Sequence, residues 1–231
     1  MIKVIEIALA ETGYLEKASP AELDSKTAPS GSGNYTKYAR DLDAVPGFYN
    51  GPKQGYPWCE VFVDWCFVQA YGVETAKRVI FHTDCGAGCM QSAAAYRAAG
   101  RFDREPRAGD QVYFGKQGSE THTGIVYEVS QSSVSVIEGN SSDGVRLRMY
   151  SRDDKNICGY GHPAYELIDG EAGKETEKRM PENDGLVECL VKVLQAMLIS
   201  RGYSCGECGI DGELGPATYA AAKAYYEKKG R

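Results

Sequence analysis

The chain has 231 residues, a formal net charge of −6, a pI near 5.2 and 42% hydrophobic residues. This composition is typical of a globular protein, and the acidic balance argues against nucleic acid as the main ligand, because phosphate binding needs a basic face. The apolar runs are far shorter than the ~20 residues of a membrane span, so we expect no membrane insertion.

The N-terminal residues 2–11 carry the pattern of an amphipathic helix. Glu6 interrupts the apolar run, and no basic region precedes it, so the segment does not read as a secretory signal. We therefore expect a protein made in the cytoplasm without a cleaved signal peptide.

The chain contains eight cysteines, which fit either a disulfide framework or free thiols. The absence of a leader favours free thiols, one of them reactive. Cys205 and Cys208 have half of a zinc-site spacing, but the C-terminal region adds only Cys189 and no histidine, so we expect no zinc site. The sequence leaves open the oxidation state of Cys85, Cys89 and the 205/208 pair.

Residues 1–167 are predicted to form one α+β domain. A short amphipathic segment follows at 34–42, and a loop rich in glycine and proline then leads to a helical apolar stripe that starts at Trp58 and ends at Gly72. After Gly100, turn signals and alternating patterns predict strands over 111–114, 121–129, 134–140, 145–150 and 157–160. Helices followed by an antiparallel sheet are typical of the α+β class.

The C-terminal part of the chain begins with a charged segment, 168–184, that is poor in large apolar residues and is predicted to be a linker. Residues 185–231 then predict a small all-α domain, with one helix ended by Gly202, a glycine-rich loop and a last helix over 217–228. Such a small unit can bind a ligand but is too small for a catalytic site.

Two residues suggest nucleophilic chemistry. Cys59 is predicted in the first turn of a helix, where free backbone N–H groups and the helix dipole stabilise a thiolate and could hold an oxyanion. A buried structural thiol is the alternative. His122 opens a predicted strand, and Gly124 on the same face leaves space for a substrate; otherwise His122 is a rim residue. His82 and His162 are interpreted as surface or structural residues.

Glu138 and Asn140 follow two valines on one face of the next predicted strand. In an antiparallel hairpin, a carboxylate or amide there can reach an imidazole on the neighbouring strand and fix its tautomer. The alternative is a solvated strand edge. With Cys59 and His122, these residues suggest a cysteine hydrolase that needs no metal or cofactor.

These residues resemble the CHAP family, the cysteine, histidine-dependent amidohydrolases/peptidases of phage lysins and bacterial wall enzymes. The resemblance spans most of residues 35–163 and is carried by Tyr56-Pro-Trp-Cys-Glu-Val-Phe-Val-Asp-Trp-Cys-Phe67, Ala108-Gly-Asp-Gln-Val-Tyr-Phe114, Thr121-His-Thr-Gly-Ile-Val126 and Val136-Ile-Glu-Gly-Asn140. It implies a papain-like fold with Cys59 as nucleophile, His122 as base and Glu138 as orienting group. Asn140 would be an auxiliary polar group.

The same resemblance bears on metals and on the aspartates. Some family members hold calcium with aspartates in the loop before the nucleophile, but residues 50–57 contain none, so we expect no calcium there. Asp64 and Asp110 are interpreted as structural.

The C-terminal segment resembles the small helical peptidoglycan-binding domain. The matching motifs are Val191-Lys-Val-Leu-Gln195, Gly202-Tyr203 and Ile210-Asp-Gly-Glu-Leu-Gly-Pro-Ala-Thr218. Ligand contacts are expected from the loop 203–215.

Together, the resemblances imply a phage endolysin or autolysin that binds and cuts bacterial peptidoglycan. We expect a monomer that reaches the wall after holin-type release and acts as an N-acetylmuramoyl-L-alanine amidase. The alternatives are an endopeptidase of stem or cross-bridge peptides, a non-catalytic wall-binding protein, and a general thiol protease or deamidating toxin.

Overall fold

The computed structural model describes residues 2–83, 86–168, 184–206 and 216–229. Its backbone divides into two compact units, Met1–Glu171 and Ala172–Arg231. The segment predicted as a linker lies almost entirely outside the described residues, and the exact domain boundaries stay a prediction. No helix in the described ranges has the length and apolar character needed to cross a bilayer.

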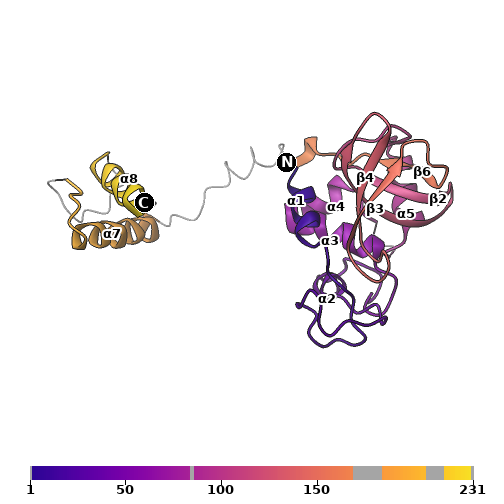
Figure 1. Ribbon diagram of the computed structural model, residues 1–231, viewed down its shortest axis with the longest axis horizontal. Coiled ribbons are helices and arrows are strands. Elements are labelled where there is room, and N and C mark those ends of the chain that lie inside the picture. The colour runs from indigo at the N-terminus through magenta and orange to yellow at the C-terminus, as the bar shows by residue number, and fades with distance from the viewer. Residues whose placement is uncertain (1, 84–85, 169–183, 207–215, 230–231) are drawn as a thin grey trace. The chain divides into compact units, whose positions relative to one another are not determined.

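Helices occupy the first part of the larger unit (Figure 1). They are α1 (Lys3–Ala10), α2 (Lys37–Asp43), α3 (Cys59–Tyr71), α4 (Val73–Val79) and α5 (Cys89–Ala98). The first three confirm helices predicted from the sequence. The sequence patterns did not predict α4, which has fewer than two turns, or α5, whose alanines give no clear apolar stripe.

Helix α3 is the central helix of this unit. Ten of its thirteen residues are buried, so the helix is enclosed on nearly all sides instead of along the predicted single stripe. The buried set includes the carboxyl residues Glu60 and Asp64. Gly72 ends the helix as predicted, with a φ of 77° that side chains rarely adopt.

The sheet is antiparallel throughout, with strand order β1-β6-β2-β3-β4-β5. Its strands are β1 (Phe102–Asp103), β2 (Gln111–Lys116), β3 (Ser119–Val129), β4 (Ser133–Glu138), β5 (Arg146–Ser151) and β6 (Ile157–Gly161). Every predicted strand is present, although β4 ends at Glu138 and not at Asn140. The two-residue β1 carries too little sequence to show a pattern. Helices followed by an antiparallel sheet confirm the α+β class.

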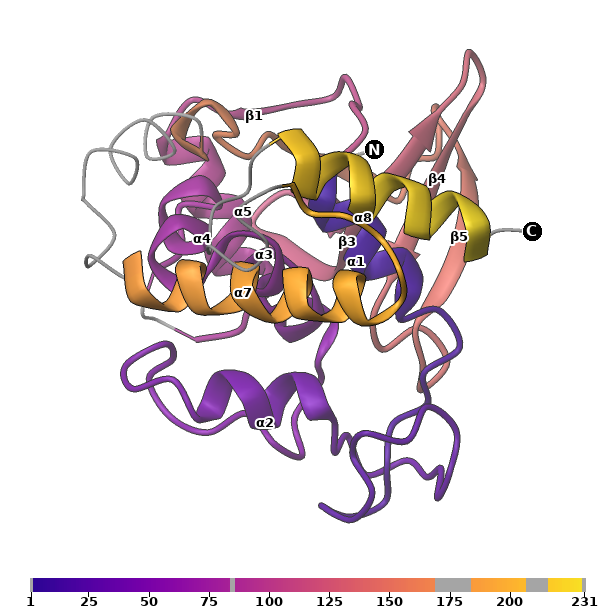
Figure 2. The same cartoon turned by 90° about the vertical axis from the view of Figure 1, so that its left-hand side faces the viewer.

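Alternate residues of the strands face two separate clusters. Tyr113, Ile125 and Ile137 belong to the main core with the helices, whereas Val112 and Val126 belong to a smaller cluster. Helices α3 and α5 contact β3, and Figure 2 shows α3, α4 and α5 to one side of β4 and β5. The start of α3 is thereby brought close to the central strands.

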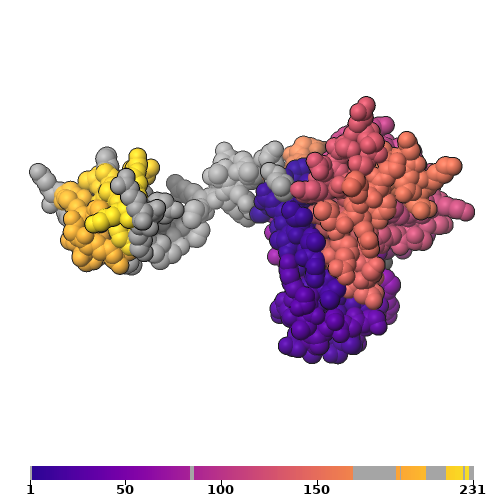
Figure 3. Space-filling model, viewed as in Figure 1, coloured from indigo at the N-terminus to yellow at the C-terminus, as the bar shows by residue number. Residues whose placement is uncertain are grey.

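The segment after α1 packs against the turn that follows β4 (Figure 3). Gly13 N–H donates to the Val145 carbonyl over 3.0 Å, and Val145 N–H donates back to the Tyr14 carbonyl over 2.9 Å. These bonds position Glu16, two residues after Tyr14, against the start of α3.

The smaller unit contains α7 (Asp184–Ser200) and α8 (Pro216–Lys229), in agreement with the helices predicted there. Gln195 Nε2 donates to Thr218 Oγ1 over 3.0 Å, which joins the two helices. Leu198, Cys205 and Ala221 form a small buried cluster. Most of the glycine-rich loop lies outside the described residues.

Candidate active site

The candidate nucleophile Cys59 is the first residue of α3 and follows the N-cap residue Trp58. The Trp58 side chain is fully buried, and its indole N–H donates to Glu16 Oε2 over 2.7 Å. Glu16 is also buried, and its other oxygen accepts a 2.9 Å bond from the Asn34 backbone N–H. These contacts fix the entry to the helix and hence the position of the sulfur.

Three groups surround the Cys59 sulfur. Cys89 Sγ lies 3.6 Å away, and the His122 ring and the Glu60 backbone N–H also act on the pKa of the thiol. The hydrogen bond with Cys89 is the largest influence, and with His122 it lowers the pKa of Cys59 well below its usual range, although burial acts in the opposite direction. The sulfur is therefore held toward the thiolate form.

His122 lies within β3, opposite Phe114 of β2, and its Nε2 is 3.0 Å from Glu138 Oε2. Burial lowers the pKa of His122, but hydrogen bonds with Cys59 and Glu138 outweigh burial and raise the pKa to about 9. The ring is therefore held toward imidazolium, between a thiolate and a carboxylate. The structure thus brings together three of the four predicted site residues.

Gly124 has a different role from the one predicted, which was to leave space for a substrate. A Cβ at this position would lie 2.7 Å from the Ile137 carbonyl oxygen and 2.9 Å from Glu138 Cγ. The register that pairs Ile125 with Ile137 brings Glu138 beside the glycine. The missing side chain therefore lets the Glu138 carboxylate pass over β3 to His122, and the predicted substrate space is filled by β4.

Tyr150 of β5 extends this series of hydrogen bonds, and sequence reasoning missed it. Its hydroxyl donates to Glu138 Oε1 over 2.6 Å, and its ring lies 4.9 Å from that of Phe114. Both oxygens of the buried Glu138 carboxylate are thereby bonded. Tyr150 pairs with Val134, so strand alternation places it on the Glu138 face, but only once the register is known.

Asn140 lies two residues beyond the end of β4, with a φ of 56°. The backbone has left the strand there, so Asn140 does not continue the strand face as predicted. Within the described residues, no hydrogen bond joins it to Cys59, His122 or Glu138. Its auxiliary role stays a prediction.

Two buried carboxyl groups lie on α3 near the nucleophile. Burial raises the pKa of Glu60 well above its usual range, and Gln111 Nε2 donates to its Oε1 over 2.9 Å. Burial also raises the pKa of Asp64 to about 6, and its carboxylate accepts a 2.6 Å bond from the Tyr49 hydroxyl. A Glu60 held toward its neutral form places no like charge beside a Cys59 thiolate.

The other two histidines have structural roles. The His82 ring stacks on Phe48, with its Nε2 2.7 Å from the Phe48 carbonyl oxygen. His162 lies between Asp103 and Asp110, at 2.9 and 3.0 Å. Both side chains are nearly enclosed, which agrees with the structural alternative and not with a surface position.

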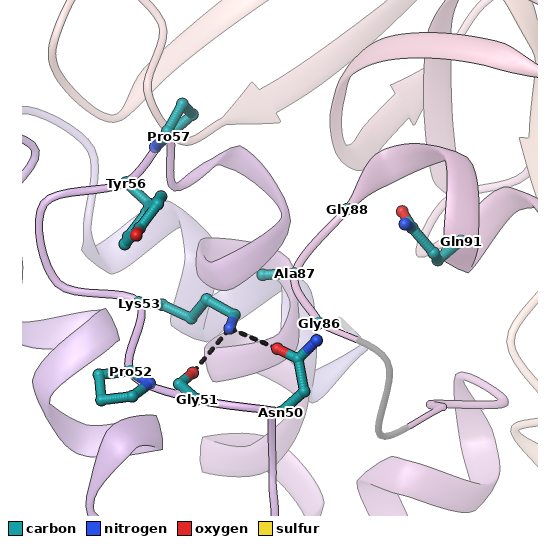
Figure 4. A pocket seen from close by; sticks show the side chains of 10 residues that line it. All are labelled: Asn50, Gly51, Pro52, Lys53, Tyr56, Pro57, Gly86, Ala87, Gly88 and Gln91. Atoms are coloured by element: carbon teal, nitrogen blue, oxygen red, sulfur yellow. Dashed lines mark hydrogen bonds between the residues drawn. The ribbon is translucent and has the colours of Figure 1, made fainter.

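A pocket of about 590 Å³ opens between the loops that lead into α3 and α5 (Figure 4). Its lining residues are Asn50, Gly51, Pro52, Lys53, Tyr56, Pro57, Gly86, Ala87, Gly88 and Gln91. Lys53 is the charged residue of this set, and its Nζ donates to two neutral oxygens, Asn50 Oδ1 and the Gly51 carbonyl, over 2.9 and 2.6 Å. The lining includes Pro57, two residues before Cys59, and Gly88, the residue before Cys89, so the pocket lies next to the starts of both helices.

The cysteines whose side chains the structure describes are free thiols, as the sequence favoured. They are Cys59, Cys66, Cys89, Cys158 and Cys205. Cys85 and Cys208 lie outside the described residues. In the part of the chain that the structure describes, no group of three or more His, Cys, Asp or Glu side chains could hold a metal ion.

The arrangement contains the parts of nucleophilic acyl transfer. Cys59 supplies a thiolate, His122 can hold and return a proton, and Glu138 fixes the imidazole orientation. With Nε2 bound to Glu138, Nδ1 is the other ring nitrogen and can serve the sulfur. Backbone N–H groups at the start of a helix have no partner within the helix, so those in the first turn of α3 are suited to bind an oxyanion.

Residues 51–140 match the family model of the CHAP domain, and the match contains all four predicted site residues. No curated protein matches the chain. Two solved structures, "The crystal structure of Ly7917" and "The crystal structure of Ly7917 with the hydrolyzing product of MDP", are similar over 70% of this chain, with 12% identity and a TM-score of 0.41. The match spans 61% of the length of those chains.

Proposed function

We propose that the chain hydrolyses an amide bond in bacterial peptidoglycan, with Cys59 as nucleophile, His122 as general base and acid, and Glu138 as the group that orients the imidazole. The observation that carries this proposal is the place of the His122 ring, which lowers the pKa of Cys59 on one side and has its Nε2 3.0 Å from Glu138 on the other. The CHAP match supports peptidoglycan as the substrate class.

The proposed reaction has two steps. The Cys59 thiolate attacks the amide carbonyl carbon, and the resulting oxyanion accepts hydrogen bonds from N–H groups at the start of α3. When the carbon–nitrogen bond breaks, His122 gives its proton to the leaving amine. His122 then takes a proton from water, which attacks the thioester, releases the carboxylic acid and restores Cys59.

We propose that the pocket between the loops that lead into α3 and α5 holds the peptide part of the substrate. Peptidoglycan peptides carry free carboxylates, and the Lys53 ammonium group is bonded to neutral oxygens in this pocket, so its charge is available to an anion. The exposed ring of Tyr56 offers an apolar surface next to it.

Among the amide bonds that the resemblance allows, we propose the N-acetylmuramoyl-L-alanine bond as the one cut. Mass spectrometry of digested walls locates the new amino terminus and tests this choice. A new terminus on L-alanine would agree with an amidase. A new terminus inside the stem or cross-bridge would identify an endopeptidase instead.

For the smaller unit, we propose wall binding. Its resemblance to a peptidoglycan-binding domain supports this role, as does a pocket of about 290 Å³ lined by Arg201, Tyr203, Tyr225 and Lys228. Tyrosine rings and cations suit a saccharide bearing a carboxylate. In the full chain, Tyr203→Ala is expected to weaken sedimentation with purified walls, whereas Tyr219→Ala, at an exposed position outside the pocket, should not.

The main test of the proposed function is loss of turbidity of purified walls. We expect Cys59→Ala and His122→Ala each to reduce the rate by at least roughly 10³-fold. Cys158→Ser is the matched control, because this partly buried thiol contacts Glu120 and not the site. Lysis that survives Cys59→Ala would contradict the mechanism, and wall binding without lysis by the wild type would identify a binding protein.

A further inference from the structure

We propose that Cys89 is a second functional thiol, which forms a reversible disulfide with Cys59 and so switches the hydrolase off under oxidising conditions. This inference rests on the proposed function, because the switch acts by consuming the nucleophile. Neither the composition nor the motifs of the sequence pointed to this pair.

The geometry of the two sulfurs supports a bond between them. Cys59 and Cys89 are the first residues of α3 and α5, and their Sγ atoms are 3.6 Å apart. A disulfide has a sulfur–sulfur length of about 2.05 Å, so the two sulfurs must approach by about 1.5 Å. Rotation of the two side chains and a small shift at the start of α5 can supply it, because the helix is entered through an extended Gly88.

The two thiols differ in pKa, and a redox switch needs one reactive thiolate and one protonated thiol. The hydrogen bond from Cys89 and the neighbouring His122 lower the pKa of Cys59, which is the thiolate and reacts first with an oxidant. The same contact with Cys59, together with burial, raises the pKa of Cys89, which stays protonated until its partner has been oxidised. A reactive thiolate beside a resolving thiol is typical of redox-sensitive sites.

Cys66 shows what a purely structural thiol on α3 looks like. It is completely buried, and burial raises its pKa well above the usual range. Cys89 is also buried, but its sulfur lies 3.6 Å from that of Cys59, and the residue before it, Gly88, lines the open pocket. Small oxidants that enter this pocket therefore reach the residue next to Cys89.

Hydrogen peroxide serves as the oxidant, and the reaction balances in two steps. The Cys59 thiolate attacks one peroxide oxygen, the O–O bond breaks with two electrons from sulfur, and Cys59 becomes a sulfenic acid. The hydroxide that leaves takes the proton that His122 received from the Cys59 thiol and becomes the first water. Cys89 then attacks the Cys59 sulfur, the S–O bond breaks, and the hydroxyl leaves as water with the proton of Cys89. In total, two thiols and one peroxide give one disulfide and two waters.

The test treats the full chain with hydrogen peroxide, with and without later dithiothreitol, and compares each variant with its own untreated lysis rate. We expect the wild type to lose lysis, to recover it with dithiothreitol, and to yield a Cys59–Cys89 cross-linked peptide lighter by two hydrogens. Cys89→Ala should lose lysis without recovery, because Cys59 proceeds to sulfinic acid. Cys158→Ser should behave as the wild type.

Cys89→Ser keeps the size of the side chain, and it should also fail to recover. Recovery in either Cys89 variant that equals the wild type would overturn the proposal, as would loss of lysis in the wild type without the cross-linked peptide. The peptide map does not depend on wall cleavage. A cross-link in a chain that never lyses walls would therefore refute the proposed function and leave the disulfide standing.

Discussion

The pH dependence of wall cleavage tests the contact between His122 and Glu138. Hydrogen bonds with Cys59 and Glu138 raise the pKa of His122 from 6.5 to about 9. Since one pH unit corresponds to about 1.4 kcal/mol, the site stabilises the imidazolium by roughly 3 kcal/mol. His122 must carry a proton to release the amine, so activity is expected to persist below this pKa and to fall as the pH rises through about 9.

Glu138→Gln removes the carboxylate charge and leaves a side chain of nearly the same shape. Because Glu138 supplies only part of the rise, the alkaline limb of the profile should move down by about one pH unit. The loss of orientation should lower kcat at neutral pH by roughly 10²-fold. Tyr150→Phe is the matched control, because it keeps the carboxylate and its 3.0 Å contact with His122, so the alkaline limb should stay near 9.

The assay measures initial rates of turbidity loss across acidic and alkaline buffers of constant ionic strength, which keeps the screening of the charges fixed. Circular dichroism at each pH confirms that the variants stay folded. An alkaline limb of Glu138→Gln that coincides with the wild-type limb would refute the assignment of Glu138 as the group that holds the imidazolium.

Three further predictions follow from buried contacts and from the pocket. Glu16→Ala leaves the Trp58 indole N–H unpaired and should lower the free energy of unfolding in urea by about 3 kcal/mol; an unchanged urea midpoint would contradict this. Gly124→Ala places a Cβ 2.9 Å from Glu138 Cγ and should displace the carboxylate, so kcat should fall by a larger factor than KM rises. A variant with the thermal stability and kcat of the wild type would show that the strand accommodates the methyl group. Lys53→Met should raise KM for walls with little change in kcat, whereas Lys53→Arg, which keeps the charge, should have a KM near that of the wild type. An unaltered KM in Lys53→Met would show that the pocket does not bind the substrate.

Local sequence patterns predicted the elements that carry the reacting groups. The helix that starts at Cys59 and the strand that holds His122 were both found from periodicity and turn signals, because each is long enough to show its period. The pairing of His122 with Glu138 also followed, since both lie on consecutive strands of a hairpin.

Contacts that depend on register or on distant packing could not be found in this way. Tyr150 bonds to Glu138 through the β4–β5 register, and Cys89 meets Cys59 because α3 and α5 both pack on β3. A local sequence pattern encodes neither contact. Gly124 was placed on the correct strand, but its neighbour across the sheet was unknown, so the space above it was assigned to a substrate. The sequence therefore predicted the helix and strands that carry the reacting groups, but not the contacts that neighbouring strands and helices make with those groups.

Substitution of Cys89 separates activation of the nucleophile from its oxidation. With Cys59 held as the thiolate, the Cys89 thiol is the donor between the two sulfurs and favours that thiolate. Cys89→Ala removes this donor, so it should raise the pKa of Cys59 and move the acidic limb of the pH profile to higher pH. Cys89→Ser keeps a donor of similar reach, so its acidic limb should stay near that of the wild type. Alkylation rates of Cys59 at each pH measure the thiolate directly. If the serine and alanine variants shared one acidic limb, the thiolate of Cys59 would owe nothing to a hydrogen bond from residue 89, and His122 and the Glu60 backbone N–H would have to account for it.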